Sequence, residues 1–302
     1  MAVAGVVTAV LFVTSTLGGT AGAPPTAGPA LAAPTFPSPP AGSLVLARQD
    51  RDLAIGLAVS RHAGSLALQA SVIGQEQPAS GLSVSFHVPG TAPVPGTACG
   101  AGCYRAVVDA TSPRTIAVAV RRPNRPPSSA VFALPQLPAP PAAALVRRVE
   151  KTWRSLRTLV NHDRLSSGPG SLLQTVWRFQ APYRLSYRIE NGPAAVAIGS
   201  RRWDKVVGGG WQESQQDPIR QPIPLWVSAT DAHLLGSATL SGRPVWKVSF
   251  FDPQLPAWFT LWVEKATMRT LKLDMIAQAH FMHELYGPFN SSFTIVPPGK
   301  ST

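Results

Sequence analysis

The sequence predicts a mainly β protein of the α+β type, in which one helix separates two groups of strands. Short apolar runs alternate with Gly and Pro turns from residue 52 to residue 134, and this pattern returns after residue 170. Only residues 142–160 combine helical spacing of apolar residues with a charged opposite face. The 31 prolines and 25 glycines among 302 residues are also too many for a helical bundle. We therefore expect two domains, each with its own apolar core.

The N-terminal segment, residues 1–20, is predicted to be a membrane anchor or a signal segment. Its first 17 residues carry no charge, and this length is at the lower limit for a membrane-spanning helix. A secretory signal normally begins with Lys or Arg, whereas the first basic residue here is Arg48. Three interpretations stay open: an atypical signal peptide cleaved near residues 21–23, an uncleaved anchor, or the end of a larger membrane region. All three place the chain at the extracytoplasmic face of the cell membrane, and residues 21–47 are then a linker rich in Pro and Ala.

Residues 48–135 are predicted to form an immunoglobulin-like β-sandwich domain. Residues 65–73 and 82–88 alternate apolar and polar side chains, which is typical of strands with one buried face. Roughly seven such runs, separated by turns, occur at the spacing expected of this sandwich. Cys99 and Cys103 are separated by three residues, two of them Gly, and an exported compartment would oxidise the pair to a disulfide. Metal binding is the alternative, and it would need at least one further ligand.

The second domain is predicted over residues 142–298, after a Pro-rich hinge at residues 136–141. It begins with the helix over residues 142–160, whose apolar stripe includes Val149, Trp153, Leu156 and Val160. Arg and Lys cover the opposite face of this helix. Strand patterns follow as far as residue 293, so we expect one curved antiparallel sheet with the helix lying across it.

The sequence shows none of the common catalytic motifs. It contains no Gly-x-Ser-x-Gly elbow, no phosphate-binding glycine pattern and no His-Glu-x-x-His. Asp and Glu are sparse and are not paired along the chain as in glycosidases. We therefore predict a binding protein that is not an enzyme. Its formal charge of +12 is spread over both domains, which favours attraction to a membrane surface over binding to nucleic acid.

One short run near the C-terminus is a candidate copper site, and copper is the only cofactor that the sequence suggests. If this run is a strand, His280 and Met282 point to one face and His283 to the other. Imidazole and thioether together are a soft donor set that suits Cu(I). In the alternative interpretation, Met282 is a core side chain and His280 hydrogen-bonds to a neighbouring carbonyl.

Tryptophan is abundant in the second domain and has two interpretations. The candidates for lining an apolar cavity are Trp153, Trp177, Trp203, Trp211, Trp246 and Trp262. In the functional interpretation, they surround a lipid-like ligand in a space that the helix closes incompletely. In the alternative, they pack an ordinary core between the sheet and the helix.

Several motifs of the second domain follow a recognisable order. They are the helix with Trp153 and Leu156, residues 179–187 (Phe-Gln-Ala-Pro-Tyr-Arg-Leu-Ser-Tyr), residues 198–203, Gly210-Trp211, residues 242–246 and residues 261–264. In this order they resemble the LolA-like family of lipoprotein carriers. The resemblance implies a curved antiparallel half-barrel with an N-terminal helix and an apolar cavity for lipid or lipoprotein.

Residues 52–57 and 99–106 of the first domain resemble a small β-sandwich of the YtkA-like type. In actinobacterial CopD-type copper-resistance proteins, such a module follows the last transmembrane helix. The resemblance implies a role in copper homeostasis, with a copper-transport membrane protein as partner. We therefore predict a membrane-tethered extracytoplasmic binding module associated with copper, and a lipid or lipoprotein carrier as the alternative.

Overall fold

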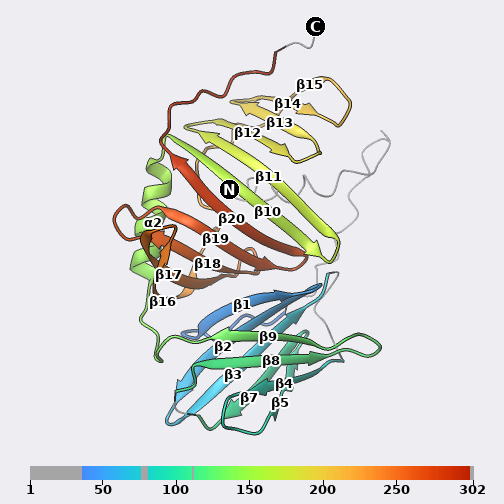
Figure 1. Cartoon of the computed structure of the whole chain (residues 1–302), viewed down its shortest axis with the longest axis vertical. Coiled ribbons are helices and arrows are strands. Elements are labelled where there is room, and N and C mark those ends of the chain that lie inside the picture. The colour runs from blue at the N-terminus through green and yellow to red at the C-terminus, as the bar shows by residue number, and fades with distance from the viewer. Residues whose placement is uncertain (1–35, 76–80, 111, 300–302) are drawn as a thin grey trace.

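The computed structural model describes residues 36–75, 81–110 and 112–299. This part of the chain contains 20 strands and one helix, arranged as a two-sheet sandwich beside a large curved sheet (Figure 1). The predicted mainly β, α+β fold class is therefore confirmed. The predicted anchor at residues 1–20 and the linker up to residue 35 lie outside the described residues.

Two antiparallel sheets of the N-terminal half face each other across one apolar core. The first has the order β1 (Leu44–Asp50), β2 (Leu53–His62), β3 (Ser65–Ile73), β7 (Cys103–Val108) and β6 (Thr97–Gly100). The second has the order β5 (Val94–Pro95), β4 (Ser83–His87), β8 (Thr115–Arg121) and β9 (Ser128–Ala133). Ile55, Phe86 and Val118 lie in this core. Leu44 and Leu46 join it, so β1 begins four residues before the predicted domain start at residue 48.

The predicted disulfide between Cys99 and Cys103 is present at the hairpin between β6 and β7. The two Cα atoms are 5.0 Å apart. Gly102 has a φ of 64°, a left-handed conformation that glycine adopts without steric cost, and this closes the short turn. Both sulfurs are used in the bond, so neither is available as a metal ligand.

Eleven antiparallel strands form the large sheet of the C-terminal half. Their order begins with β15 (Trp211–Gln215), β14 (Arg201–Lys205), β13 (Ala194–Ile198), β12 (Arg184–Ile189), β11 (Ser171–Gln180) and β10 (Thr158–Gly168). It continues with β20 (His280–Phe289), β19 (Thr270–Ala277), β18 (Ala257–Glu264), β17 (Arg243–Asp252) and β16 (Thr230–Leu240). After β15 the chain forms β16 at the opposite edge of the sheet. The strands that follow lie progressively closer to the centre, where β20 pairs with β10. This crossover places β10 and β20, the first and last strands of the sheet, side by side.

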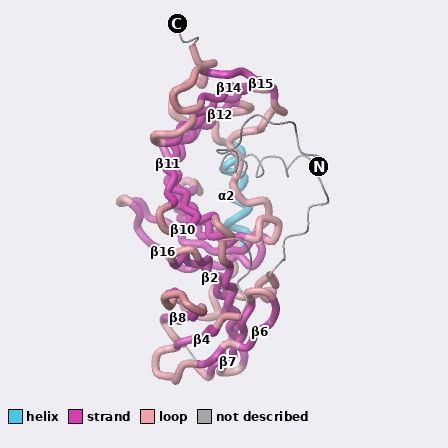
Figure 2. Tube along the Cα trace, turned by 90° about the vertical axis from the view of Figure 1, so that its right-hand side faces the viewer, coloured by secondary structure: helices cyan, strands magenta, loops and turns pink. Residues whose placement is uncertain are grey.

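The helix α2 (Ala143–Ser155) lies against one face of this sheet, as Figure 2 shows. Val146, Val149 and Trp153 pack there against apolar residues of β17 to β20. The predicted extension of the helix to residue 160 is wrong, because Leu156 has an extended backbone and Val160 pairs within β10. Among the described residues, α2 included, no helix is long and apolar enough to cross a membrane.

The sandwich packs against the outer face of the large sheet, so that β2 is buried on both of its faces. Ala54 and Ala58 of β2 and Val45 of β1 contact Phe251 and Trp258 of the large sheet in a shared apolar cluster. Strands buried on both faces have nearly continuous apolar sequences, as residues 53–59 do. The small residues of β2 leave room for the Trp258 indole, which lies directly over Gly56.

Candidate functional site

A cavity of about 560 Å³ opens on the inner face of the large sheet, the face that α2 partly covers. Alternate residues of β10, β11, β12, β19 and β20 point into it, as the pleat of a strand requires. Its apolar wall includes Leu165, Leu173, Trp177, Ile189, Met275 and Met282. The loop residues Leu225 and Leu255 border it opposite the sheet. Its volume and mainly apolar wall are typical of sites for small ligands.

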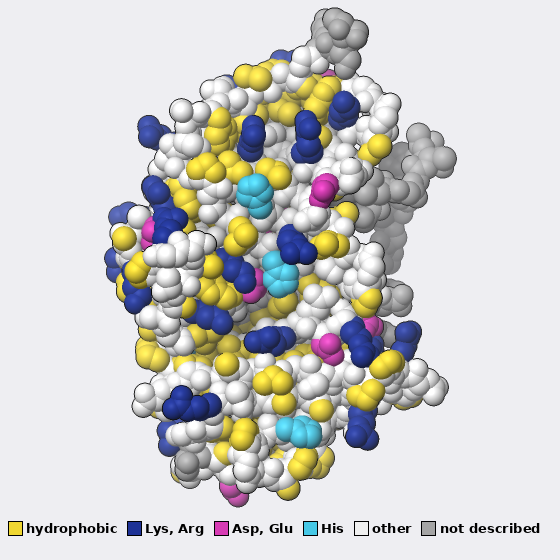
Figure 3. Space-filling view, in the orientation of Figure 1, with side chains coloured by type: hydrophobic (Ala, Val, Ile, Leu, Met, Phe, Trp, Pro, Cys, Tyr) yellow, Lys and Arg dark blue, Asp and Glu magenta, His cyan; other side chains and the backbone are white. Residues whose placement is uncertain are grey.

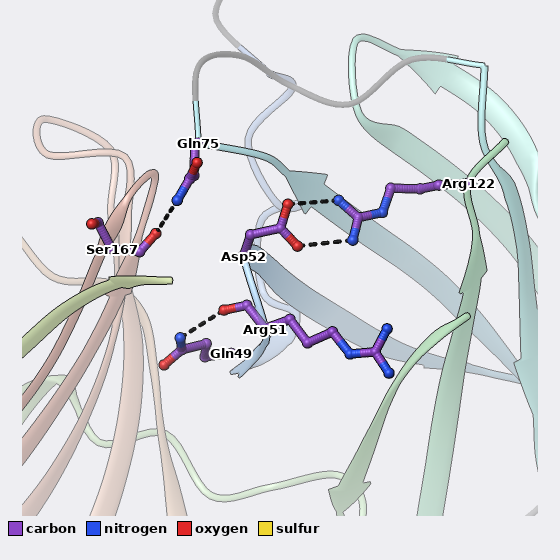
Figure 4. A network of polar contacts seen from close by, with 6 residues as sticks. All are labelled: Gln49, Arg51, Asp52, Gln75, Arg122 and Ser167. Atoms are coloured by element: carbon purple, nitrogen blue, oxygen red, sulfur yellow. Dashed lines mark hydrogen bonds and ion pairs between the residues drawn. The ribbon is translucent and has the colours of Figure 1, made fainter. Parts of the chain in front are cut away.

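The N-terminal half contributes to the rim of this cavity through Phe36 and Gln75. The Phe36 ring stacks on Trp258, with 5.3 Å between the ring centroids. The Gln75 side-chain amide donates a 2.7 Å hydrogen bond to the carbonyl of Ser167, at the end of β10 (Figure 4). The Gln278 amide in turn donates to the Gln75 carbonyl over 3.3 Å. Both halves of the chain therefore shape the entrance.

A bidentate ion pair lies near this contact, within the sandwich. The Arg122 guanidinium donates to both carboxylate oxygens of Asp52 over 2.7 and 2.8 Å (Figure 4). The hydrogen bonds from Arg122 hold the pKa of Asp52 below its ordinary value. The pair joins the turn between β1 and β2 to the end of β8, on the side of the sandwich that meets the large sheet.

Four polar side chains form a block on the inner face of β10 and β20. The register of these strands places Asn161 opposite Tyr286 and Asp163 opposite Glu284. The Asn161 amide donates a 2.8 Å hydrogen bond to one oxygen of Glu284, and the Tyr286 hydroxyl donates to the other. Asp163 lines the cavity although only 5% of its surface is exposed. Through Asp163, the block therefore adds a buried carboxyl group to the mainly apolar wall of the cavity.

Burial controls the protonation of the two carboxyl groups in this block. It raises the pKa of Asp163 to about 7, against smaller lowering effects of the hydrogen bond to Trp177 and the charge of His283. Burial also raises the pKa of Glu284 well above its ordinary value, and the charge of Asp163 raises it further. Two adjacent buried carboxylates repel each other, so the pair keeps at least one proton near neutral pH.

Three of the predicted cavity tryptophans lie on the inner side of the sheet, and one of them lines the cavity. Trp177 forms part of the wall, with its ring 4.7 Å from that of Tyr187. Trp153 is buried under α2, donates a 3.2 Å hydrogen bond to Thr270 and does not reach the cavity. Trp246 packs against the core that α2 covers.

The other three predicted tryptophans lie away from the cavity. Trp203 donates a 3.1 Å hydrogen bond to Glu213 on the neighbouring edge strand. Trp211 lies on β15, at the edge of the sheet. Trp262 lines a second groove, of about 420 Å³, between the sandwich and the large sheet. The structure therefore divides these six residues among the cavity wall, the core under α2, the edge strands and the second groove.

The predicted copper residues are also divided between the two faces of β20. His280 and Met282 both line the cavity, and Met275 lies directly opposite Met282 on β19. The Nδ1 atom of His280 is 3.0 Å from the carbonyl oxygen of Gln278. His283 faces the second groove instead. No group of three or more His, Cys, Asp or Glu residues in the described part of the chain is arranged to hold a metal ion.

The second groove has a polar, basic lining. Lys247 and Lys272 lie over the Trp262 ring, at 5.1 and 4.2 Å from its centroid. Asp274 accepts from Lys272 over 3.3 Å and lies 2.8 Å from Nδ1 of His283. Burial lowers the pKa of Lys247. Figure 3 shows that Lys and Arg side chains on this side of the molecule are spread out, as expected from the diffuse charge of the sequence.

Sequence reasoning missed the polar block. Asp163 and Glu284 stand near opposite ends of the second domain, and no local motif connects them. The sequence did show that Asp163 and Glu284 each occupy a position of a strand pattern where an apolar, inward-facing side chain is expected. That signal has no meaning until the two strands are known to be neighbours.

No protein-family model matches the chain, and no curated protein matches it significantly. Among solved structures, it is similar to LprF from Mycobacterium bovis, with 12% identity and a TM-score of 0.38 over 53% of this chain and 99% of that one. It is also similar to a putative outer membrane lipoprotein-sorting protein domain from Vibrio parahaemolyticus, with 9% identity and a TM-score of 0.27 over 50% and 93%. A LolA superfamily protein from Nitrosomonas europaea gives 12% identity and a TM-score of 0.24 over 50% and 94%. At these values the likeness identifies no ligand, so a functional proposal depends on the cavity itself.

Proposed function

We propose that the protein is a non-enzymatic, extracytoplasmic carrier that binds a lipid-like apolar chain in the cavity of the large sheet. The observation that carries this proposal is the cavity of about 560 Å³ with its wall of Leu, Ile, Met and Trp side chains. Covering this wall with a ligand removes apolar surface from water, which stabilises the complex by about 25 cal/mol for each Å². Each methylene group of a ligand chain that is buried there makes the free energy of binding more favourable by about 0.8 kcal/mol.

Membrane tethering and export are part of the proposal. The uncharged segment at residues 1–20 and the disulfide between Cys99 and Cys103 support them, because disulfides persist in oxidising compartments. A carrier at the membrane surface would receive its ligand from the lipid phase or from a membrane-bound partner.

Copper homeostasis, which the YtkA-like resemblance implies, has less support than the lipid-carrier alternative. His283 lies on the opposite face of β20 from His280 and Met282, so the three residues cannot bind one ion together. The pair of Met275 and Met282 beside His280 offers soft donors that suit Cu(I). Copper at these three residues is therefore a second candidate.

The neutral fluorophore phenylnaphthylamine tests the proposal, since its emission rises in apolar surroundings. We expect it to bind the delipidated full chain and to quench Trp177, which lines the cavity. Replacing the cavity residue Ala277 by Phe should weaken binding at least about tenfold by filling the space. The matched control Ala238→Phe changes an exposed residue of β16 and should bind like the unmodified protein.

Native mass spectrometry of protein purified from membranes provides a second test that needs no variant. We expect a co-purifying apolar ligand that is released by organic solvent. Absence of both a co-purifying ligand and fluorophore binding would rule out the carrier function. Equal fluorophore binding by the Ala277 and Ala238 variants, with both folded by circular dichroism, would exclude this cavity as the site.

A further inference from the structure

The polar block of Asn161, Asp163, Glu284 and Tyr286 has a hydrogen-bond pattern that an apolar chain alone does not explain. Both oxygens of Glu284 accept a hydrogen bond, one from Asn161 and one from Tyr286. The Oδ1 atoms of Asn161 and Asp163 are buried and have no donor. Buried acceptors are nearly always paired, because an unpaired one loses its hydration without compensation. The block is therefore short of hydrogen-bond donors.

Asp163 connects this block to the ligand space. It lines the cavity while the rest of the wall around it is largely apolar, and it is more than nine-tenths buried. On the neighbouring strand β11, Thr175 lies directly opposite Asp163 and also faces the cavity. A ligand chain that lies along Leu165 and Leu173 would bring its polar end to this carboxyl group.

The described residues of the cavity wall place no permanently charged cation beside Asp163. Among the described residues, no Lys or Arg lines the cavity. His280 lies at the wall, with its Nδ1 held by a backbone carbonyl. His283 lies on the other face of β20 beside Asp274.

Two charged groups on neighbouring elements already have other partners. On β14, Arg202 approaches Tyr187 of the cavity wall and forms a 2.7 Å ion pair with Asp204. On α2, Glu150 accepts a 3.0 Å hydrogen bond from the Trp226 indole. No Lys or Arg among the described residues of the cavity wall therefore compensates an ionised Asp163, and the charge of His283 acts on it from the other face of β20. Buried charges are normally paired, so an ionised Asp163 favours a cation inside the cavity.

We propose that the ligand of this cavity is an amphiphile with a protonated amine head, which donates hydrogen bonds to Asp163 while its alkyl chain lies along the apolar wall. This inference rests on the carrier function proposed above and names its ligand class. An alkylammonium supplies both the missing donors and the missing positive charge. A fatty acid would place a second negative charge beside Asp163, and an alcohol would supply a donor but no charge.

The protonation of Asp163 gives this preference a pH dependence. With a pKa of about 7, Asp163 is mostly neutral at about pH 6 and mostly ionised at about pH 8. An alkylamine stays protonated across this range, as the Lys side chain does. Affinity for the amine should therefore rise with pH through neutrality, whereas affinity for a neutral alcohol should not.

The experiment measures displacement of phenylnaphthylamine from the full chain by decylamine, decanol and decanoic acid, which share one chain length. At about pH 8 we expect decylamine to bind about tenfold more tightly than decanol, and decanoic acid to bind most weakly. The advantage of the amine should shrink at about pH 6. Asp163→Asn should abolish the advantage while decanol binding persists, and the matched variant Asp217→Asn, at an exposed position outside the cavity, should keep it.

Two negative outcomes are distinct. If all three compounds bind with equal affinity at both pH values, the carrier function stands and the amine proposal is overturned. If neither the fluorophore nor any decyl compound binds, the carrier function fails and the amine proposal fails with it. The pH comparison uses unmodified protein, so it decides the proposal even if the Asp163 variant does not fold.

Discussion

Replacing Asp163 by Asn should flatten the pH dependence of folding stability between about pH 5 and pH 8. In the folded protein, burial raises the pKa of this carboxyl group to about 7, from an ordinary value of 3.8. Between these two values the folded state keeps a proton that the unfolded state has released. Stability therefore falls as the pH rises, by about 1.4 kcal/mol for each pH unit.

From about pH 5 to pH 7 this group alone costs about 2 kcal/mol of stability, and the loss levels off above its folded pKa. Asn cannot ionise, so the variant should lose this part of the slope. The part that belongs to Glu284 should remain through its burial, without the further raising effect of the Asp163 charge. Urea unfolding of the full chain, followed by tryptophan fluorescence at several pH values, measures the difference. The Asp217→Asn variant controls for the change in net charge. Parallel pH profiles for the Asp163 variant and the unmodified protein would refute the proposed burial of a titrating carboxyl group.

Two further predictions concern the contact between the halves and the copper candidate. Gly56→Ala should destabilise the protein by about 1–3 kcal/mol, because a Cβ there lies 2.4 Å from the Trp258 indole. Gly210→Ala, with no atom within 4 Å, should change the thermal midpoint little, and equal effects of the two variants would contradict the packing. His283→Ala should leave a Cu(I) titration unchanged, because its side chain faces the second groove and not the cavity beside His280. A lower affinity for Cu(I) in this variant would show that His283 takes part in binding.

Local sequence patterns were sufficient to predict strands and one helix. In β3, Leu66, Leu68 and Ala70 alternate with less apolar residues, and all three lie in the sandwich core. The apolar stripe of the helix placed Val149 and Trp153 against the sheet. The same stripe predicted too long a helix, because a sequence period does not show where strand pairing becomes more favourable than another helical turn.

The functional interpretation depended on contacts between distant parts of the chain. Tryptophan counts suggested a cavity but could not show that Trp177 faces it while Trp262 lies on the outer surface. Side chains alternate between the faces of a strand, so a difference of one residue in position reverses the assignment. The copper candidate had the same weakness, since adjacent positions on β20 face opposite sides of the sheet.

The sequence by itself determined a disulfide hairpin and mainly β halves separated by one helix, because the pattern for each of these lies in neighbouring residues. Only the tertiary structure decided that Asp163 lines the cavity and lies opposite Glu284. The pairing of the first and last strands of the large sheet brings them together. The raised pKa of each carboxyl group then follows from exclusion of water, which is a property of the packed sheet and not of the local sequence.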